Sequence, residues 1–128
     1  MVARLVTAVA LACAVACSHP QLGPGEVYDS QVITEDEIVA SRASNAYEII
    51  HKLRANFLTN RGQTTLNRSD SNPYPVVYVD DQEFGPISTL SGIPAAQISS
   101  IRLYRVSEAN AKYGNHNMSG VISIITRH

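Results

Sequence analysis

Three segments in the second half of the chain carry hydrophobic patterns that are typical of β-strands. In residues 98–106, Ile101 and Leu103 alternate with a basic and an aromatic side chain, which is the two-residue period of a strand with one buried face. Residues 76–79 and 121–126 are runs of β-branched and apolar side chains with almost no polar break. Such runs favour strands that are covered on both faces. We therefore expect a sheet of at least three strands.

Two helices are predicted before the first of these strands. Thr34 and Glu37 have the spacing of a capping box, in which each side chain accepts a hydrogen bond from the backbone amide of the other residue. One or two helical turns are expected after this box. Ser44 is the candidate N-cap of a second, longer helix, whose apolar side chains recur at helical spacing: Ala46, Ile50, Leu53 and Phe57.

The remaining elements are short and are joined by polar segments. Residues 59–74 predict a long loop, and residues 80–83 predict a turn after the strand 76–79. Ser107 is the candidate N-cap of a short helix over residues 108–113, which Gly114 ends. The order of elements is mixed and not strictly alternating, so we predict an α+β fold: a small mixed β-sheet with two main helices and a short third helix.

Length and charge limit the class of protein. The chain has 128 residues, with 10 Lys and Arg against 11 Asp and Glu, and a net charge of −1. This length fits one domain with a tail. The charge balance excludes a generally basic nucleic-acid binder, and we predict no nucleic-acid partner. Cys13 and Cys17 are the only cysteines, so packing and not a disulfide framework must hold the domain together.

The N-terminus has the pattern of a secretory signal peptide. Arg4 precedes an uncharged, largely apolar stretch over residues 5–16. This stretch is too short to span a bilayer, which requires roughly 20 apolar residues. We therefore expect residues 1–16 to direct export.

A lipid-attachment motif follows the apolar stretch. Residues 14–17, Ala-Val-Ala-Cys, resemble the bacterial lipobox, in which small side chains precede the cysteine that becomes the lipidated N-terminus. Cys17 is therefore the predicted attachment site, with Cys13 as a competing position. The alternative is an ordinary signal cleaved after Ala16, which leaves Cys17 as a free thiol. Ser18 follows the cysteine, and the lipoprotein resemblance implies anchoring in the bacterial outer membrane, facing the periplasm.

The predicted division of the chain has three parts. Residues 1–16 form the signal peptide, and residues 17–31, rich in Pro and Gly, form a lipidated tether. Residues 32–128 form the folded domain, which begins with a short extended piece at Val32 and Ile33.

Catalytic and metal-binding patterns are weak. The four histidines, which are not at ligand spacing, predict no metal site: His19, His51, His116 and His128. Asp80, Asp81 and Glu83 cluster as Ca²⁺ ligands would, but they lack the spaced oxygens of a calcium loop, so a solvated turn is expected. No nucleophile–base arrangement and no phosphate-binding loop is recognisable. We expect no cofactor and no enzymatic activity.

Two further patterns can be interpreted either as functional sites or as features without a function. Arg102, Arg105 and Arg127 could share one face or end of the sheet and meet an acidic partner, or they could lie on a solvated outer face. Asn67 and Asn117 begin Asn-x-Ser sequences, which are glycosylation acceptors in other settings. Bacterial export makes these two matches coincidental.

The order of motifs in the second half resembles a known family. The strand ending in Asp80, the isoleucine-rich strand 98–106, an alanine-containing helix closing on Tyr113-Gly114 and the final Gly120-Val121-Ile122 strand follow in sequence. This pattern resembles the plug domain of TonB-dependent outer-membrane receptors, and the likeness covers residues 32–127. Asp80-Asp81 replaces the usual Asp-Gly of the family's hairpin, and we expect no barrel after His128.

The resemblance implies a plug-like domain without a pore of its own. We expect a binding or accessory module in outer-membrane transport, whose partner is a TonB-dependent receptor or a periplasmic protein. The alternative is a structural or protein-interaction lipoprotein that has no part in uptake.

Overall fold

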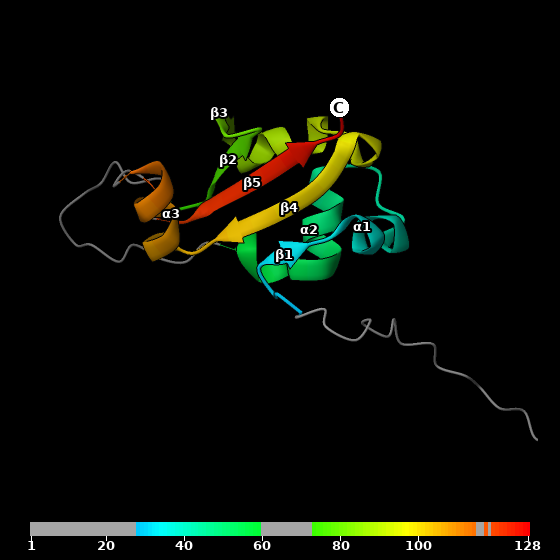
Figure 1. The fold of residues 1–128 in the computed structure, drawn as a ribbon, viewed down its shortest axis with the longest axis horizontal. Helices are drawn as coiled ribbons and strands as arrows, with labels where there is room; N and C mark the ends of the chain where they lie inside the picture. The colour runs from blue at the N-terminus through cyan, green and yellow to red at the C-terminus, as the bar shows by residue number, and fades with distance from the viewer. Residues whose placement is uncertain (1–27, 60–72, 115–116, 118) are drawn as a thin grey trace, which may run out of the picture.

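Five strands and six helical segments make up the part of the chain that the computed structural model describes, residues 28–59, 73–114, 117 and 119–128 (Figure 1). The strands are β1 (Val32–Ile33), β2 (Val76–Val79), β3 (Gln82–Pro86), β4 (Ile98–Tyr104) and β5 (Val121–Thr126). The α-helices are α1 (Glu35–Ser41), α2 (Ala46–Arg54) and α3 (Val106–Tyr113), and the 3-10 helices are η1 (Ala55–Phe57), η2 (Ile87–Gly92) and η3 (Ala95–Gln97). The predicted α+β fold with a small mixed sheet is confirmed.

The strands form one sheet in the order β1-β4-β5-β2-β3. The pair β2–β5 is parallel, and the other three neighbouring pairs are antiparallel. The strands β1 and β3 form the two edges of the sheet. The strands β2 and β5, which are the continuous apolar runs in the sequence, lie in its interior, as expected for strands covered on both faces. Since parallel neighbours need a long crossover, the chain passes through β3, η2, η3, β4 and α3 between β2 and β5.

Alternation along the strands separates two faces of the sheet. The face that we call the core face carries Val77, Ile101, Leu103, Ile122 and Ile124, all fully buried. The helices α1 and α2 contribute four buried side chains to the same cluster: Ile38, Ala46, Ile49 and Ile50. Figure 1 shows α2 beside β4 and β1, and α1 following the end of β1. The opposite face, which we call the tyrosine face, carries the alternate side chains, as expected from the two-residue period of a strand.

Side-chain caps begin both α1 and α2, but one of the two caps differs from the prediction. Thr34 and Glu37 form the predicted capping box at the start of α1. The prediction that Ser44 caps the second helix was wrong: Asn45 is the N-cap, and its Oδ1 accepts from the Glu48 amide at 3.0 Å. The Ser44 carbonyl instead accepts from the Ala95 amide at 3.0 Å, so a contact with η3 fixes the backbone one residue earlier than the cap.

Four other boundaries differ from the sequence prediction. The strand predicted over residues 98–106 ends at Tyr104. The second helix ends at Arg54, and the buried Phe57 lies in η1 beyond it. Ser107 is not the N-cap of α3, because that helix begins at Val106 with Arg105 as its N-cap. The predicted turn over residues 80–83 is two residues too long, since β3 already starts at Gln82. Cross-strand hydrogen bonds extend the hairpin to its tip and thus override the polar character of its residues.

Candidate functional site

Three tyrosines meet on the tyrosine face, where α3 packs against the sheet. Tyr78 comes from β2, Tyr104 from the end of β4, and Tyr113 from the last residue of α3. The ring of Tyr113 lies 4.2 Å from that of Tyr78 and 5.6 Å from that of Tyr104, measured between centroids. Ser123 of β5 lies beneath them, with its Oγ 3.3 Å from the Tyr113 hydroxyl. We call these three rings the tyrosine cluster.

The ammonium group of Lys112 contacts two rings of the tyrosine cluster and the neighbouring Asp81. It donates to Asp81 Oδ1 at 2.8 Å and to the Tyr104 hydroxyl at 3.3 Å. It also lies over two ring faces, 4.8 Å from the centroid of Tyr113 and 5.2 Å from that of Tyr104, within the range of cation–π attraction. The hydrogen bond to Asp81 raises the pKa of Lys112 well above its ordinary value. This lysine therefore stays charged and engaged within its own domain.

Asp81 holds the cluster together from the hairpin turn. Its Oδ1 accepts from Lys112 and, at 2.9 Å, from the Tyr113 hydroxyl. These hydrogen bonds, the lysine first, lower the pKa of the Asp81 carboxyl. Burial is the main cause that raises the pKa of Tyr78 in the same cluster. Tyr78 thus keeps its proton while the Asp81 carboxyl loses its own, so that a charged carboxylate faces the Lys112 ammonium group.

The turn that presents Asp81 has both central residues in left-handed conformation. Asp80 has φ 49° and Asp81 has φ 64°, and Val79 pairs with Gln82 across them, as in a two-residue type I′ hairpin. Asp80 is fixed by Thr126, whose amide and hydroxyl donate to its carboxylate at 3.0 and 2.6 Å. These two bonds lower the pKa of Asp80. Both carboxylates therefore serve the fold.

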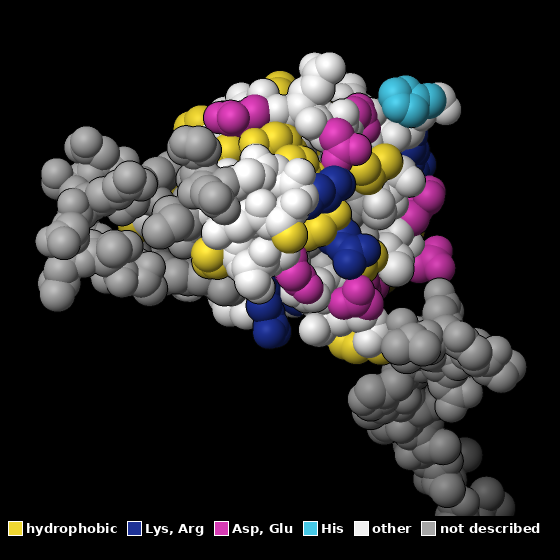
Figure 2. All heavy atoms as spheres, turned by 60° about the vertical axis from the view of Figure 1, so that its left-hand side comes forward, with side chains coloured by type: hydrophobic (Ala, Val, Ile, Leu, Met, Phe, Trp, Pro, Cys, Tyr) yellow, Lys and Arg dark blue, Asp and Glu magenta, His cyan; other side chains and the backbone are white. Residues whose placement is uncertain are grey.

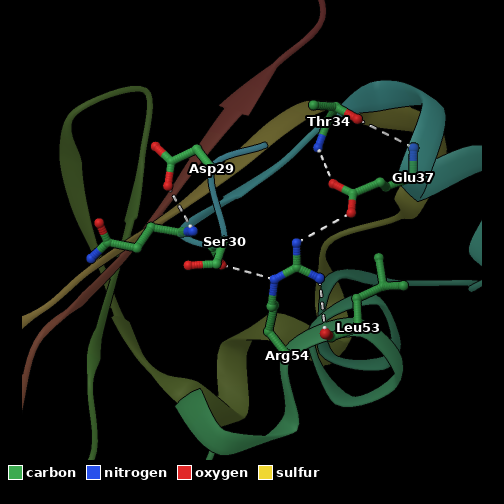
Figure 3. A network of polar contacts seen from close by, with 7 residues as sticks. Asp29, Ser30, Thr34, Glu37, Leu53 and Arg54 are labelled. Atoms are coloured by element: carbon green, nitrogen blue, oxygen red, sulfur yellow. Dashed lines mark hydrogen bonds and ion pairs between the residues drawn. The ribbon is translucent and has the colours of Figure 1, made fainter. Parts of the chain in front are cut away.

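A second polar network lies where the chain enters the domain (Figure 3). Arg54, at the end of α2, donates from Nε to the Ser30 carbonyl at 2.9 Å and from Nη2 to Glu37 Oε1 at 3.2 Å. Its guanidinium carbon lies 5.4 Å from the centroid of the Tyr28 ring. The other carboxylate oxygen of Glu37 accepts from the Thr34 amide. One arginine thus connects the entering chain, the start of α1 and the end of α2.

The three arginines singled out in the sequence do not form one site. Arg102 lies on the tyrosine face, 5.2 Å from the ring of Tyr104. Arg105 follows the end of β4, whereas Arg127 donates to the carbonyl of Ile98 at the start of that strand and pairs with Glu35 at 2.7 Å. Antiparallel pairing of β4 and β5 places Arg105 and Arg127 at opposite ends of the sheet.

Charge on the molecular surface is mixed. Figure 2 shows Lys and Arg side chains interspersed with Asp and Glu on the face that it presents. This distribution agrees with the net charge of −1 and gives no continuous basic stripe of the kind that nucleic acids require on that face.

Some of the other candidate residues lie in the described part of the chain and some lie outside it. His51 is exposed on α2 and stacks on Tyr47 with 5.9 Å between ring centroids. Asn117 is buried and donates to the Gly114 carbonyl at 3.3 Å, a position that a glycan could not reach. Cys13, Cys17, His19, Asn67 and His116 lie outside the described residues. Within the described ranges, no group of three or more potential ligands is arranged to hold a metal ion.

Neither the tyrosine cluster nor the role of Arg54 was predicted from the sequence. A signal for the first was available, because Tyr78 and Tyr104 both fall on strand positions opposite the buried side chains. The partner Asp81 lies 31 positions before Lys112, and Ser30 lies 24 positions before Arg54. No local pattern reports contacts over such separations.

Comparisons with protein-family models, with curated proteins and with solved structures find no match to this chain. Among the described residues, none of the helices combines the length and the apolar character that crossing a membrane demands.

Proposed function

We propose that this chain is an outer-membrane lipoprotein whose plug-like domain acts as a non-catalytic binding or accessory module of outer-membrane transport. The observation that carries the proposal is the placement of the family-like residues. Ala109 is the buried residue of α3, Tyr113 packs on the sheet, and Gly114 and Gly120 both have positive φ. These four residues of the plug-like pattern therefore have roles in the fold, which supports the resemblance.

Support for a binding role comes from the polar clusters. Lys112, Asp81 and Tyr113 satisfy one another, and Ser123 is almost fully buried beneath the tyrosine rings. A nucleophile needs an adjacent base and access to substrate. The described side chains favour instead a rigid domain whose surface is recognised by another protein.

Lipid attachment is the first part of the proposal to test. Cys17→Ala should move the protein from the membrane fraction to the soluble fraction, because no acyl chain can then be attached and stable anchoring takes more than one chain. Cell fractionation followed by immunoblotting measures this shift. Cys13→Ala is the matched control and should leave the protein in the membrane. Persistence of the Cys17→Ala protein in the membrane, or release by Cys13→Ala alone, would contradict attachment at Cys17.

The role in transport is tested by identifying the protein that this domain binds. Isolation of the lipidated protein in mild detergent should recover a TonB-dependent receptor or another component of the TonB system, identified by mass spectrometry. The Cys17→Ala protein, released from the membrane, should recover at least about tenfold less, since anchoring raises the effective concentration of a membrane partner. Recovery of only periplasmic proteins that have no part in uptake would refute the accessory role and support the alternative of an unrelated interaction lipoprotein.

A further inference from the structure

The strand β1 is a short cover on one edge of the sheet. It contains only Val32 and Ile33, which pair with Arg102 and Ile101 of β4. The amide of Leu103 also donates to the carbonyl of Gln31 at 2.7 Å, just before the strand. If β1 moved away, the backbone groups of β4 on that side would lose these partners.

Arg54 fastens the chain immediately before this strand. Its hydrogen bond to the Ser30 carbonyl, its ion pair with Glu37 and its position over the Tyr28 ring all act within five residues of β1. The Arg54 side chain is only 12% exposed and that of Glu37 only 29%, so water cannot fully replace these contacts. Figure 3 shows the guanidinium group between the entering segment and the start of α1.

A two-residue strand cannot hold its place by backbone pairing alone. Short strand pairs are marginal in water, so β1 also depends on side chains: the buried Ile33, the partly buried Arg54 and an exposed hydrogen bond from Gln31 to Glu108. Removal of Arg54 leaves the Ser30 carbonyl and the Glu37 carboxylate without their charged donor. The open state of β1 then becomes more populated, while the rest of the sheet stays paired.

The opposite edge of the sheet is protected by other means. Pro86 ends β3 and cannot donate a hydrogen bond, Glu83 adds a charge, and the pairing of β2 with β3 is irregular between Val77 and Tyr78. Proline, charge and bulges are common protections of an edge strand. Along Ile101–Leu103, β4 carries one charge, Arg102, but neither a proline nor an irregularity in its pairing, and its backbone depends on β1 for cover.

We propose that Arg54 is a latch that keeps β1 on the sheet, and that opening of this latch lets β4 accept β1 of a second copy of this chain. A second copy offers the same residues in the same register, with Ile33 matching the same core position. Exchange of an identical element is a low-cost route to dimers. The latch itself does not depend on lipid attachment, although anchoring would raise the local concentration of copies.

Hydrogen exchange tests the latch on the protein as isolated from cells, in whichever anchored or released form it is obtained. Arg54→Ala should speed exchange of the Leu103 amide at least about tenfold, because a partly buried charged hydrogen-bond partner is lost. The Asp80 amide, which donates to the Ile124 carbonyl at 2.9 Å, is the reference and should keep its protection. Lys52→Ala, on the same helix but exposed, is the matched control and should match the wild type.

A second variant covers the case in which Arg54→Ala unfolds the whole domain. Glu37→Gln keeps an oxygen for the Thr34 amide and removes the charge that pairs with Arg54. It should raise exchange at Leu103 by a smaller factor than Arg54→Ala and leave Asp80 unchanged. Wild-type exchange at Leu103 in this variant and in any folded Arg54→Ala protein would overturn the latch.

A synthetic peptide of residues 28–34 tests whether the opened edge accepts a strand from another molecule. The fluorescently labelled peptide should bind the Arg54→Ala protein, or the Glu37→Gln protein if the former is unfolded, at least about tenfold more tightly than it binds the wild type. A peptide with Ser in place of Ile33 should lose this binding. Equal binding to the latched and unlatched proteins, or none to either, would refute strand exchange. Failure of lipid attachment at Cys17 would leave these results unchanged, so the two proposals fail separately.

Discussion

Gly120→Ala should destabilise the protein by about 4 kcal/mol, which is a large part of the 5–15 kcal/mol that typically separates folded and unfolded states. Two costs combine at this position. The φ of Gly120 is 92°, a conformation that side chains rarely adopt, and a Cβ atom there would lie 2.6 Å from the backbone carbonyl oxygen of Tyr104. Backbone cannot withdraw as a flexible side chain can, so β5 would have to shift against β4.

The shift would not stay local, because Gly120 also connects β5 to its other neighbour. Its carbonyl accepts from the Val76 amide at 3.3 Å, and its amide donates to the Asn117 carbonyl at 3.2 Å. Movement away from Tyr104 therefore disturbs the start of both central strands. Urea unfolding followed by far-ultraviolet circular dichroism measures the loss, since the chain has no Trp to report it by fluorescence.

Two other glycines separate the steric cost from the conformational one. Gly114 has φ 89° but nothing within 4 Å of an added Cβ, so Gly114→Ala should cost about 2 kcal/mol from backbone strain alone. Gly92 has neither the clash nor the positive φ, and Gly92→Ala should stay within about 0.5 kcal/mol of the wild type. A loss in Gly120→Ala no larger than that in Gly114→Ala would show that the approach to Tyr104 imposes no cost.

Local patterns were sufficient to predict the elements that depend on local physics. The alternation around Ile101 and Leu103 correctly separated the two faces of β4. The spacing of Thr34 and Glu37 identified the capping box, whose atoms lie within a single helical turn. Hydrophobic period and side-chain capping act over a few residues, and a single sequence contains that information.

Choices decided by distant partners could not be predicted in the same way. Ser44 and Asn45 are both good capping residues, and hydrogen bonds from Ala95 to the Ser44 carbonyl and from Ala46 to the Ile93 carbonyl decide between them. The order of the strands, with β5 between β4 and β2, likewise follows from packing of the whole core. The tyrosine cluster and the Arg54 latch arise only after that order is fixed.

Ile124→Ala should lower the free energy of unfolding by about 3 kcal/mol, within the range for deleting buried aliphatic groups. Ile124 is fully buried on the core face and pairs in register with Ile101 of β4 and Val79 of β2. The two neighbouring strands fix the surrounding backbone by hydrogen bonds, so the walls cannot collapse into the space that the side chain leaves. The cost is therefore both the lost burial and the cavity.

Ile125→Ala is the matched control, because it removes the same atoms from the next residue of the same strand. Ile125 is 38% exposed on the tyrosine face, so its truncation should cost less than about 1 kcal/mol, part of which is strand propensity. Ile125→Thr keeps the β-branch and should recover the propensity part. Urea unfolding of all three variants gives the comparison. Equal losses for Ile124→Ala and Ile125→Ala would mean that the two side chains are equally packed, which would contradict the burial of Ile124 on the core face and the exposure of Ile125 on the tyrosine face.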